Sequence, residues 1–167
     1  MLQRHQHVLS RFARHQNVYF FEEPIFDAGK EPLLMYSTRA ETLWKVVPHL
    51  NAGLTALQIT NNLKNLLNKF LDNKSLDHWI FWYYSSAYLS FTENYQPKLI
   101  FYDYLEELRA LKISTTEINL QEKKLLEKAN VVTHDGTLQR GRKYNWDKAY
   151  RDIADIIKVQ HAWIRQI

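Results

Sequence analysis

Two short runs made only of apolar and aromatic residues, 79–84 and 99–102, constrain the fold of this chain most. Continuous runs of this length are typical of strands buried on both faces, as in a parallel sheet, because a strand with one face in water alternates apolar and polar residues. Three other β-rich segments are short enough to be strands: 18–22, 43–47 and 131–133. Pro48 is expected to end the second of these, since proline has no N–H to donate to a sheet.

Longer segments with a helical period separate these runs. Residues 54–71 repeat leucine and isoleucine at three- and four-residue spacing, and Asp72 and Asn73 are expected to end that helix. The segment 24–39 holds two prolines and a glycine, and it is predicted to be an irregular excursion. Only a short helix fits at 85–95. The longer helices are predicted at about 3–15, 55–72, 116–129 and 147–163.

Strands that alternate with helices predict an α/β fold with right-handed crossovers. We expect a Rossmann-like parallel sheet of four or five strands with helices on both faces. Residues 1–133 are predicted to form this domain, and 134–167 a connector followed by an amphipathic helix that Asn145 caps. A chain of 167 residues is long enough to bury a core of this kind.

An acidic residue directly follows the apolar run at 99–102. Asp103 comes after Tyr102, and Glu106 and Glu107 follow within one helical turn. Ligands of open α/β sheets bind outside the carboxyl ends of the strands, so carboxylates at this point are candidates for chemistry. The alternative is structural: Asp103 caps the next helix, and the two glutamates favour its first turn. Spacing alone favours the structural alternative.

Several stretches together resemble one known family. Residues 3–15 read Q-R-H-Q-H-V-L-S-R-F-A-R-H, and 18–27 read V-Y-F-F-E-E-P-I-F-D. They are similar to the Q-R-P-Q-H and E-E-P-x-x-D segments of bacterial glycosyltransferases of the retaining GT-B type. The Y-D-Y-L-E-E-L sequence at 102–108 resembles the family's Y-D-x-x-D-E-L, W-Y-Y at 82–84 resembles a strand end, and A-N-V-V-T at 129–133 resembles the A-D-x-V strand.

This resemblance, which is in the family's order, implies the acceptor-side domain of a glycosyltransferase. Such an enzyme moves a sugar from a nucleotide-sugar to a glycan or lipid-linked acceptor, as in the synthesis of cell-envelope polysaccharides. Asp103 would orient or deprotonate an acceptor hydroxyl. The residues that the resemblance places in the site are Asp103 and Glu107 as catalytic groups, and Arg4, His7, Tyr84 and Glu106 as substrate-binding groups. The alternative is a non-catalytic remnant or binding module with the same fold.

The chain also departs from the family's pattern. His5 stands where the family has proline, and Glu106 replaces an aspartate. The resemblance begins at the family's first helix, so we expect an incomplete GT-B N-terminal domain that lacks the first strand. Trp146-Asp147 resembles the start of the family's closing helix, and residues 134–167 are too few for a donor-binding domain. The isolated chain is therefore expected to be inactive and to bind no cofactor, since the nucleotide-sugar needs that second domain.

Composition narrows the remaining classes of function. The chain contains no cysteine, which excludes disulfides and thiolate zinc sites. His5 and His7 point to different faces of a helix, so no metal pair is expected there. No Gly-x-Gly-x-x-Gly or Walker A loop is present, and no clustered basic motif indicates a nucleic-acid partner.

Charge and hydropathy bear on the partners and the localisation of the protein. A net charge of +4 favours anionic partners such as phospholipid head groups or phosphorylated substrates, but charge alone favours the simpler alternative of a mildly basic surface without such a partner. The sequence shows no signal-peptide pattern and no apolar run long enough to span a bilayer. We therefore predict a cytoplasmic protein, with peripheral contact to a membrane surface as an additional expectation.

Overall fold

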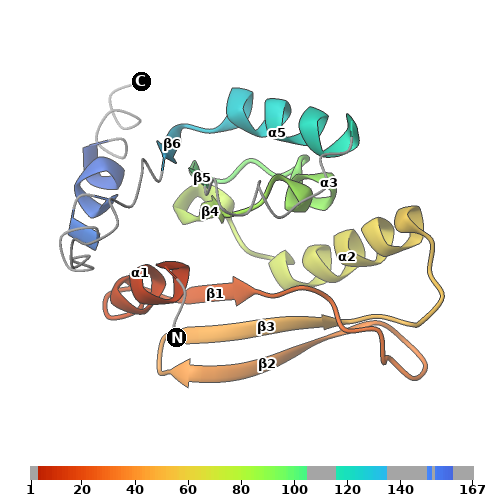
Figure 1. Cartoon of the computed structure of the whole chain (residues 1–167). Helices are drawn as coiled ribbons and strands as arrows, with labels where there is room; N and C mark the ends of the chain where they lie inside the picture. The colour runs from red at the N-terminus through yellow and green to blue at the C-terminus, as the bar shows by residue number, and fades with distance from the viewer. Residues whose placement is uncertain (1–3, 105–115, 135–149, 152, 160–167) are drawn as a thin grey trace, which may run out of the picture. The chain divides into compact units, whose positions relative to one another are not determined.

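The computed structural model describes residues 4–104, 116–134, 150–151 and 153–159. By their contacts the described residues form two compact units, one from Met1–Phe70 and Lys143–Ile167 and the other from Leu71–Arg142. The first unit contains a three-stranded mixed sheet, and the second contains a three-stranded parallel sheet (Figure 1). The chain is thus an α/β protein, as the alternation of strand and helix patterns predicts.

The sheet of the first unit is built around a central strand. Its elements are α1 (Arg4–Phe12), β1 (Val18–Phe21), β2 (Leu33–Ala40), β3 (Leu43–His49) and α2 (Ala56–Leu71). β3 lies in the middle, parallel to β1 and antiparallel to β2. A two-residue loop, Glu41-Thr42, joins β2 to β3, and the register shifts between Thr38 and Ala40. The hairpin therefore occupies the side of β3 that another parallel strand would need.

Helix α2 covers one face of this sheet (Figure 1). The ring of Phe70 lies 5.1 Å from the ring of Tyr19 and 5.4 Å from that of Phe21, centroid to centroid. It also stacks against Tyr36 of β2 at 6.3 Å. Because alternate residues of a strand point to opposite faces, these contacts leave Phe20, Lys45 and their same-side neighbours on the other face.

The described C-terminal residues pack against α1. Residues 150–151 and 153–159 are helical, and Ile153 and Ile157, four residues apart, are both buried. The ring of Tyr150 meets the ring of Phe12 edge-on, with 4.9 Å between centroids. The amphipathic pattern of this region thus reflects a buried stripe, as expected for residues at helical spacing.

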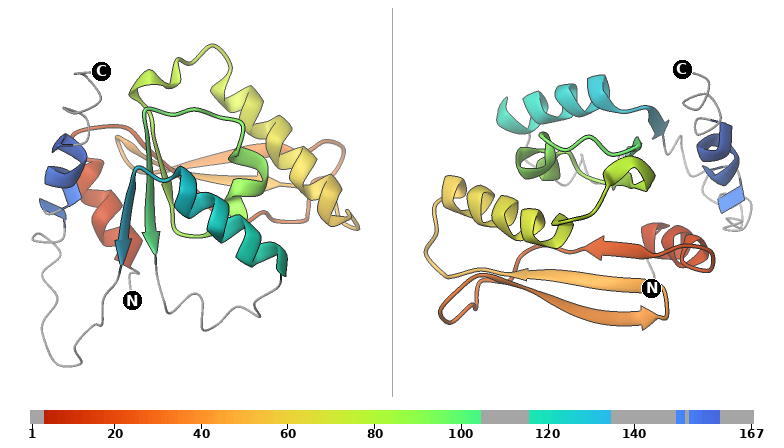
Figure 2. Two further views of the ribbon diagram at one scale, coloured as in Figure 1. Left: turned by 90° about the horizontal axis from the view of Figure 1, so that it is seen from above. Right: turned by 180° about the vertical axis from the view of Figure 1, so that it is seen from behind.

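The second unit has three parallel strands in the order β4-β5-β6. Figure 2 shows β5 and β6 side by side and running in the same direction. Tyr83 and Tyr102 project from the sheet onto Leu89 and Leu125 and form a buried cluster. The elements are η1 (Leu76–His78), β4 (Ile80–Tyr83), η2 (Ser86–Tyr88), α3 (Leu89–Thr92), β5 (Leu99–Tyr104), α5 (Thr116–Lys128) and β6 (Val131–His134).

The structure corrects three predictions. The single Rossmann-like parallel sheet of four or five strands is wrong, because the six strands found in the described part of the chain divide into two sheets of three. The excursion predicted at 24–39 contains most of β2. The predicted end of the strand at Pro48 is also wrong, because β3 continues through Pro48 to His49. β1 ends opposite Val46, so the N–H that Pro48 lacks is not needed for the pairing of β3 with β1.

Among the described residues, no helix combines the length and the hydropathy needed to cross a bilayer.

Candidate functional site

The carboxyl ends of the parallel strands hold the first candidate site. Asp103 is at the end of β5, and its register partner on β6 is Thr133. The Thr133 hydroxyl donates a hydrogen bond of 2.7 Å to Asp103 Oδ1. The Asp103 side chain has no exposed surface. The hydrogen bond between the buried Asp103 carboxylate and Thr133 links β5 and β6 at their carboxyl ends. The observed geometry therefore indicates a structural role for Asp103.

Replacement of Asp103 by alanine is expected to lower the free energy of unfolding by about 1–3 kcal/mol, because the Thr133 hydroxyl then loses its acceptor. Asp103→Asn keeps an acceptor oxygen and should cost less. Urea denaturation of Asp103→Ala, Thr133→Val and the double variant measures the coupling between the two side chains. A stability of Asp103→Ala equal to that of the wild type would contradict this structural role.

Tyr84 lies next to this strand end. It directly follows β4 and is half-buried, and its ring stacks on that of Trp82 with 5.9 Å between centroids. Tyr83 points to the opposite face, where its hydroxyl donates to Thr92 Oγ1 at 2.8 Å. Thr92 in turn donates to the Tyr88 carbonyl at 2.8 Å. Tyr84 is thus the first residue after β4, while Tyr83, the last residue of β4, belongs to the core.

The other predicted site residues are not brought to this strand end by the structure as described. Arg4 begins α1 and His7 lies half-buried in the same helix, both in the first unit, whereas Asp103 belongs to the second. Glu106 and Glu107 lie outside the described residues. The prediction that these groups line one cleft therefore stays a prediction.

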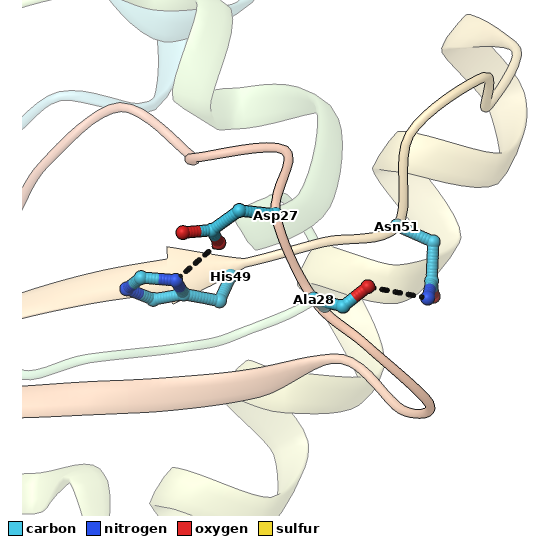
Figure 3. Close-up of polar contacts among 4 residues, drawn as sticks. All are labelled: Asp27, Ala28, His49 and Asn51. Carbon is cyan, nitrogen blue, oxygen red and sulfur yellow. Dashed lines mark hydrogen bonds and ion pairs between the residues drawn. The ribbon is translucent and has the colours of Figure 1, made fainter.

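A second candidate site lies in the first unit, at the carboxyl ends of β1 and β3. His49, the last residue of β3, places Nδ1 2.5 Å from Asp27 Oδ1 (Figure 3). The His49 side chain is 16% exposed, and that of Asp27 is 57% exposed. Two residues beyond His49, Asn51 donates from Nδ2 to the Ala28 carbonyl at 3.1 Å. A mostly buried imidazole is thus paired with a carboxylate that solvent reaches.

An ion pair lies farther along the same sheet. Lys45 Nζ is 2.7 Å from Glu22 Oε2, and both side chains are partly exposed. Lys45 and His49 are four residues apart on β3, so they share a face, about 13 Å apart along the strand. The Glu22–Lys45 pair and the Asp27–His49 pair are therefore separate along β3.

The sequence patterns do not identify His49 as a site residue. Asp27 is only the last residue of a matched segment, and a strand that ends at Pro48 leaves His49 outside it. The available signal was positional: each residue follows one of two predicted strands, and the carboxyl ends of parallel neighbours meet at one edge. Parallel pairing of β1 with β3 does bring them together.

Among the residues that the structure describes, no group of three or more histidines and carboxylates is arranged to hold a metal ion. Comparison of the chain with protein-family models, with curated proteins and with solved structures finds no match.

Proposed function

We propose that this chain is the acceptor-side part of a glycosyltransferase of the GT-B type, which moves a sugar from a nucleotide-sugar to a glycan or lipid-linked acceptor. The ordered set of segments that resemble this family supports the proposal. The observation that carries it is the position of two acids from those segments. Asp27 follows β1, Asp103 is the last residue but one of β5, and each of these strands has a parallel neighbour. Ligand-binding groups of α/β proteins gather at such strand ends.

The residue types fit an acceptor better than a nucleotide. The chain has four glycines and no glycine-rich phosphate loop. Carboxylates, imidazoles and aromatic rings, by contrast, are suited to hydroxyl groups and to the apolar faces of sugar rings. Arg4, His7, Tyr84 and Glu106 are the proposed acceptor-binding residues, and Asp103 and Glu107 the proposed catalytic pair. A lipid-linked acceptor would bring the basic chain to an anionic membrane surface.

The burial of Asp103 favours a second candidate function, a non-catalytic binding module. A general base must come within hydrogen-bond reach of the proton that it removes. The Asp103 side chain has no exposed surface, and Thr133 already donates to it. In this alternative the chain binds a glycan, and Asp103 only stabilises the sheet.

Ligand-observed NMR on the 167-residue chain tests the binding function. The probes are methyl glycosides of glucose, galactose, mannose and N-acetylglucosamine at millimolar concentration, with a nucleotide-sugar as the comparison. We expect at least one glycoside to bind weakly and the nucleotide-sugar not to bind, because GT-B enzymes hold the donor in their second domain. Absence of binding by every glycoside would exclude both candidate functions.

The same chain is expected to transfer no sugar by itself, since the GT-B reaction takes place in a cleft between two domains. Addition of a donor-binding domain in trans separates the two candidates. Transfer that depends on both polypeptides supports the enzyme, whereas glycoside binding without transfer supports the binding module. Turnover of a nucleotide-sugar by the 167-residue chain alone would contradict the assignment of this chain to the acceptor side.

A further inference from the structure

His49 lies between two exposed apolar residues of the neighbouring segments. His49 is the register partner of Leu33 on β2, and it forms a parallel bridge with Ile25 on its other side. Register partners in a sheet carry their side chains on the same face. Leu33 is 45% exposed and Ile25 46% exposed. The imidazole therefore lies on a sheet face with an aliphatic side chain on each side.

The segment that carries Asp27 is held in place by backbone hydrogen bonds to the end of β3. The Ile25 amide donates to the Pro48 carbonyl at 2.9 Å, the Leu50 amide donates to Ile25 at 2.8 Å, and the Ala28 amide donates to Leu50 at 2.9 Å. The Asn51 side chain adds a fourth bond to this segment, at the Ala28 carbonyl (Figure 3). Asp27 is thus preorganised against His49, which is what a binding site requires of its polar groups.

The pairing fixes how the imidazole can act. A carboxylate only accepts hydrogen bonds, so Nδ1 carries the proton that is shared with Asp27. In the neutral ring Nε2 then keeps its lone pair and is an acceptor. Figure 3 shows Nε2 on the side of the ring that points away from Asp27. Among the described residues, His49 makes no side-chain hydrogen bond or ion pair other than that with Asp27.

We propose that Asp27 and His49 form a sugar-binding subsite, in which His49 Nε2 accepts a hydrogen bond from a ligand hydroxyl while Ile25 and Leu33 contact the apolar face of the sugar ring. This inference rests on the proposed function and names the acceptor subsite within it. Pyranosides combine equatorial hydroxyls with faces made of C–H groups, so they match an imidazole acceptor between two aliphatic side chains. The half-exposed Asp27 carboxylate leaves room for a second hydroxyl to donate to its other oxygen.

The experiment follows the ring nitrogens of His49 by NMR in the whole 167-residue chain. In the neutral form of the ring without ligand we expect the proton on Nδ1, and Asp27→Asn should shift the population towards the other tautomer. Titration with the methyl glycosides used above should move the Nε2 signal of His49. Asp27→Asn should weaken glycoside binding by about 3- to 10-fold, the usual effect of losing one oriented hydrogen bond.

Matched variants separate this subsite from general surface effects. Glu31→Gln removes an exposed carboxylate from the same connecting segment, and His15→Gln removes an exposed imidazole from the same unit; neither should change binding. His49→Gln tests the imidazole directly, and Asp27→Asn keeps the test valid if that variant does not fold. Glycoside binding that leaves the Nε2 signal unmoved, or that Asp27→Asn does not weaken, overturns the subsite while the proposed function stands. If no glycoside binds the wild-type chain, both are wrong.

Discussion

Truncation of Leu125 to alanine is expected to lower the free energy of unfolding by about 2–5 kcal/mol, the range measured for large-to-small changes in protein cores. Leu125 lies in α5 and has no exposed surface. It belongs to the buried cluster formed with Tyr83, Leu89 and Tyr102. Loss of its side chain removes contacts with β4, β5 and α3. The rings of Tyr83 and Tyr102 are rigid, so they fill the resulting cavity poorly. Since small domains have a total stability of about 5–15 kcal/mol, this loss is large.

The next residue of the same helix provides the control. Leu126 is 45% exposed, so Leu126→Ala changes the same residue type in α5 without opening a cavity. Both variants gain equally from the higher helix propensity of alanine, which therefore cancels in the comparison. Urea denaturation followed by circular dichroism should show a large loss for Leu125→Ala and almost none for Leu126→Ala. Equal losses would mean that the cluster around Leu125 does not hold this unit together.

The sequence predicts the longer helices of this protein closely. The helix expected at 55–72 is α2, Ala56–Leu71, and the helix expected at 116–129 is α5, Thr116–Lys128. These segments are long enough for the 3.6-residue period to recur several times, and the leucines that mark it include Leu66, Leu67 and Leu125, all buried. Local periodicity is enough to predict such helices, because all the residues of the buried stripe lie within one continuous segment.

Pairing of strands is harder to predict, because it depends on residues far apart in the chain. The short runs at 18–22, 79–84 and 99–102 are all strands, yet nothing in them specifies two sheets rather than one. Strand β2 escaped prediction because nearly all of its residues are exposed, which removes the alternation of apolar and polar residues that marks a half-buried strand. Its formation depends on hairpin pairing with β3 instead.

The same limit applies to the candidate sites. The position of Asp103 at the end of a strand follows from the apolar run before it, but its hydrogen-bond donor, Thr133, comes thirty residues later. The contact between Asp27 and His49 joins residues 22 positions apart and requires β1 and β3 to pair in parallel. Sequence patterns therefore identify individual polar groups at strand ends, whereas their partners emerge only from the fold.

The stability of this protein is expected to fall steeply with pH above 10 because of Tyr83. Burial raises the pKa of Tyr83 to about 12 from the usual 10.0, against a smaller opposing effect of its hydrogen bond with Thr92. The side chain is only 5% exposed. The unfolded chain releases this proton near pH 10 and the folded chain near pH 12, so the stabilisation is complete below pH 10 and is lost as the pH rises to 12. A difference of about 2 between the two pKa values corresponds to about 3 kcal/mol.

Tyr83→Phe isolates this contribution, since phenylalanine keeps the ring and cannot ionise. The difference in unfolding free energy between the wild type and Tyr83→Phe, measured by urea denaturation from pH 9 to pH 12, should shift by up to about 3 kcal/mol in favour of the variant. The variant also loses the bond to Thr92, but that cost does not change with pH and only offsets the curve. Burial also raises the pKa of Tyr95, which is less deeply buried, so Tyr95→Phe should act in the same direction with a smaller amplitude. Parallel curves for the wild type and Tyr83→Phe across this range would show that the Tyr83 hydroxyl is not held in a buried, neutral state.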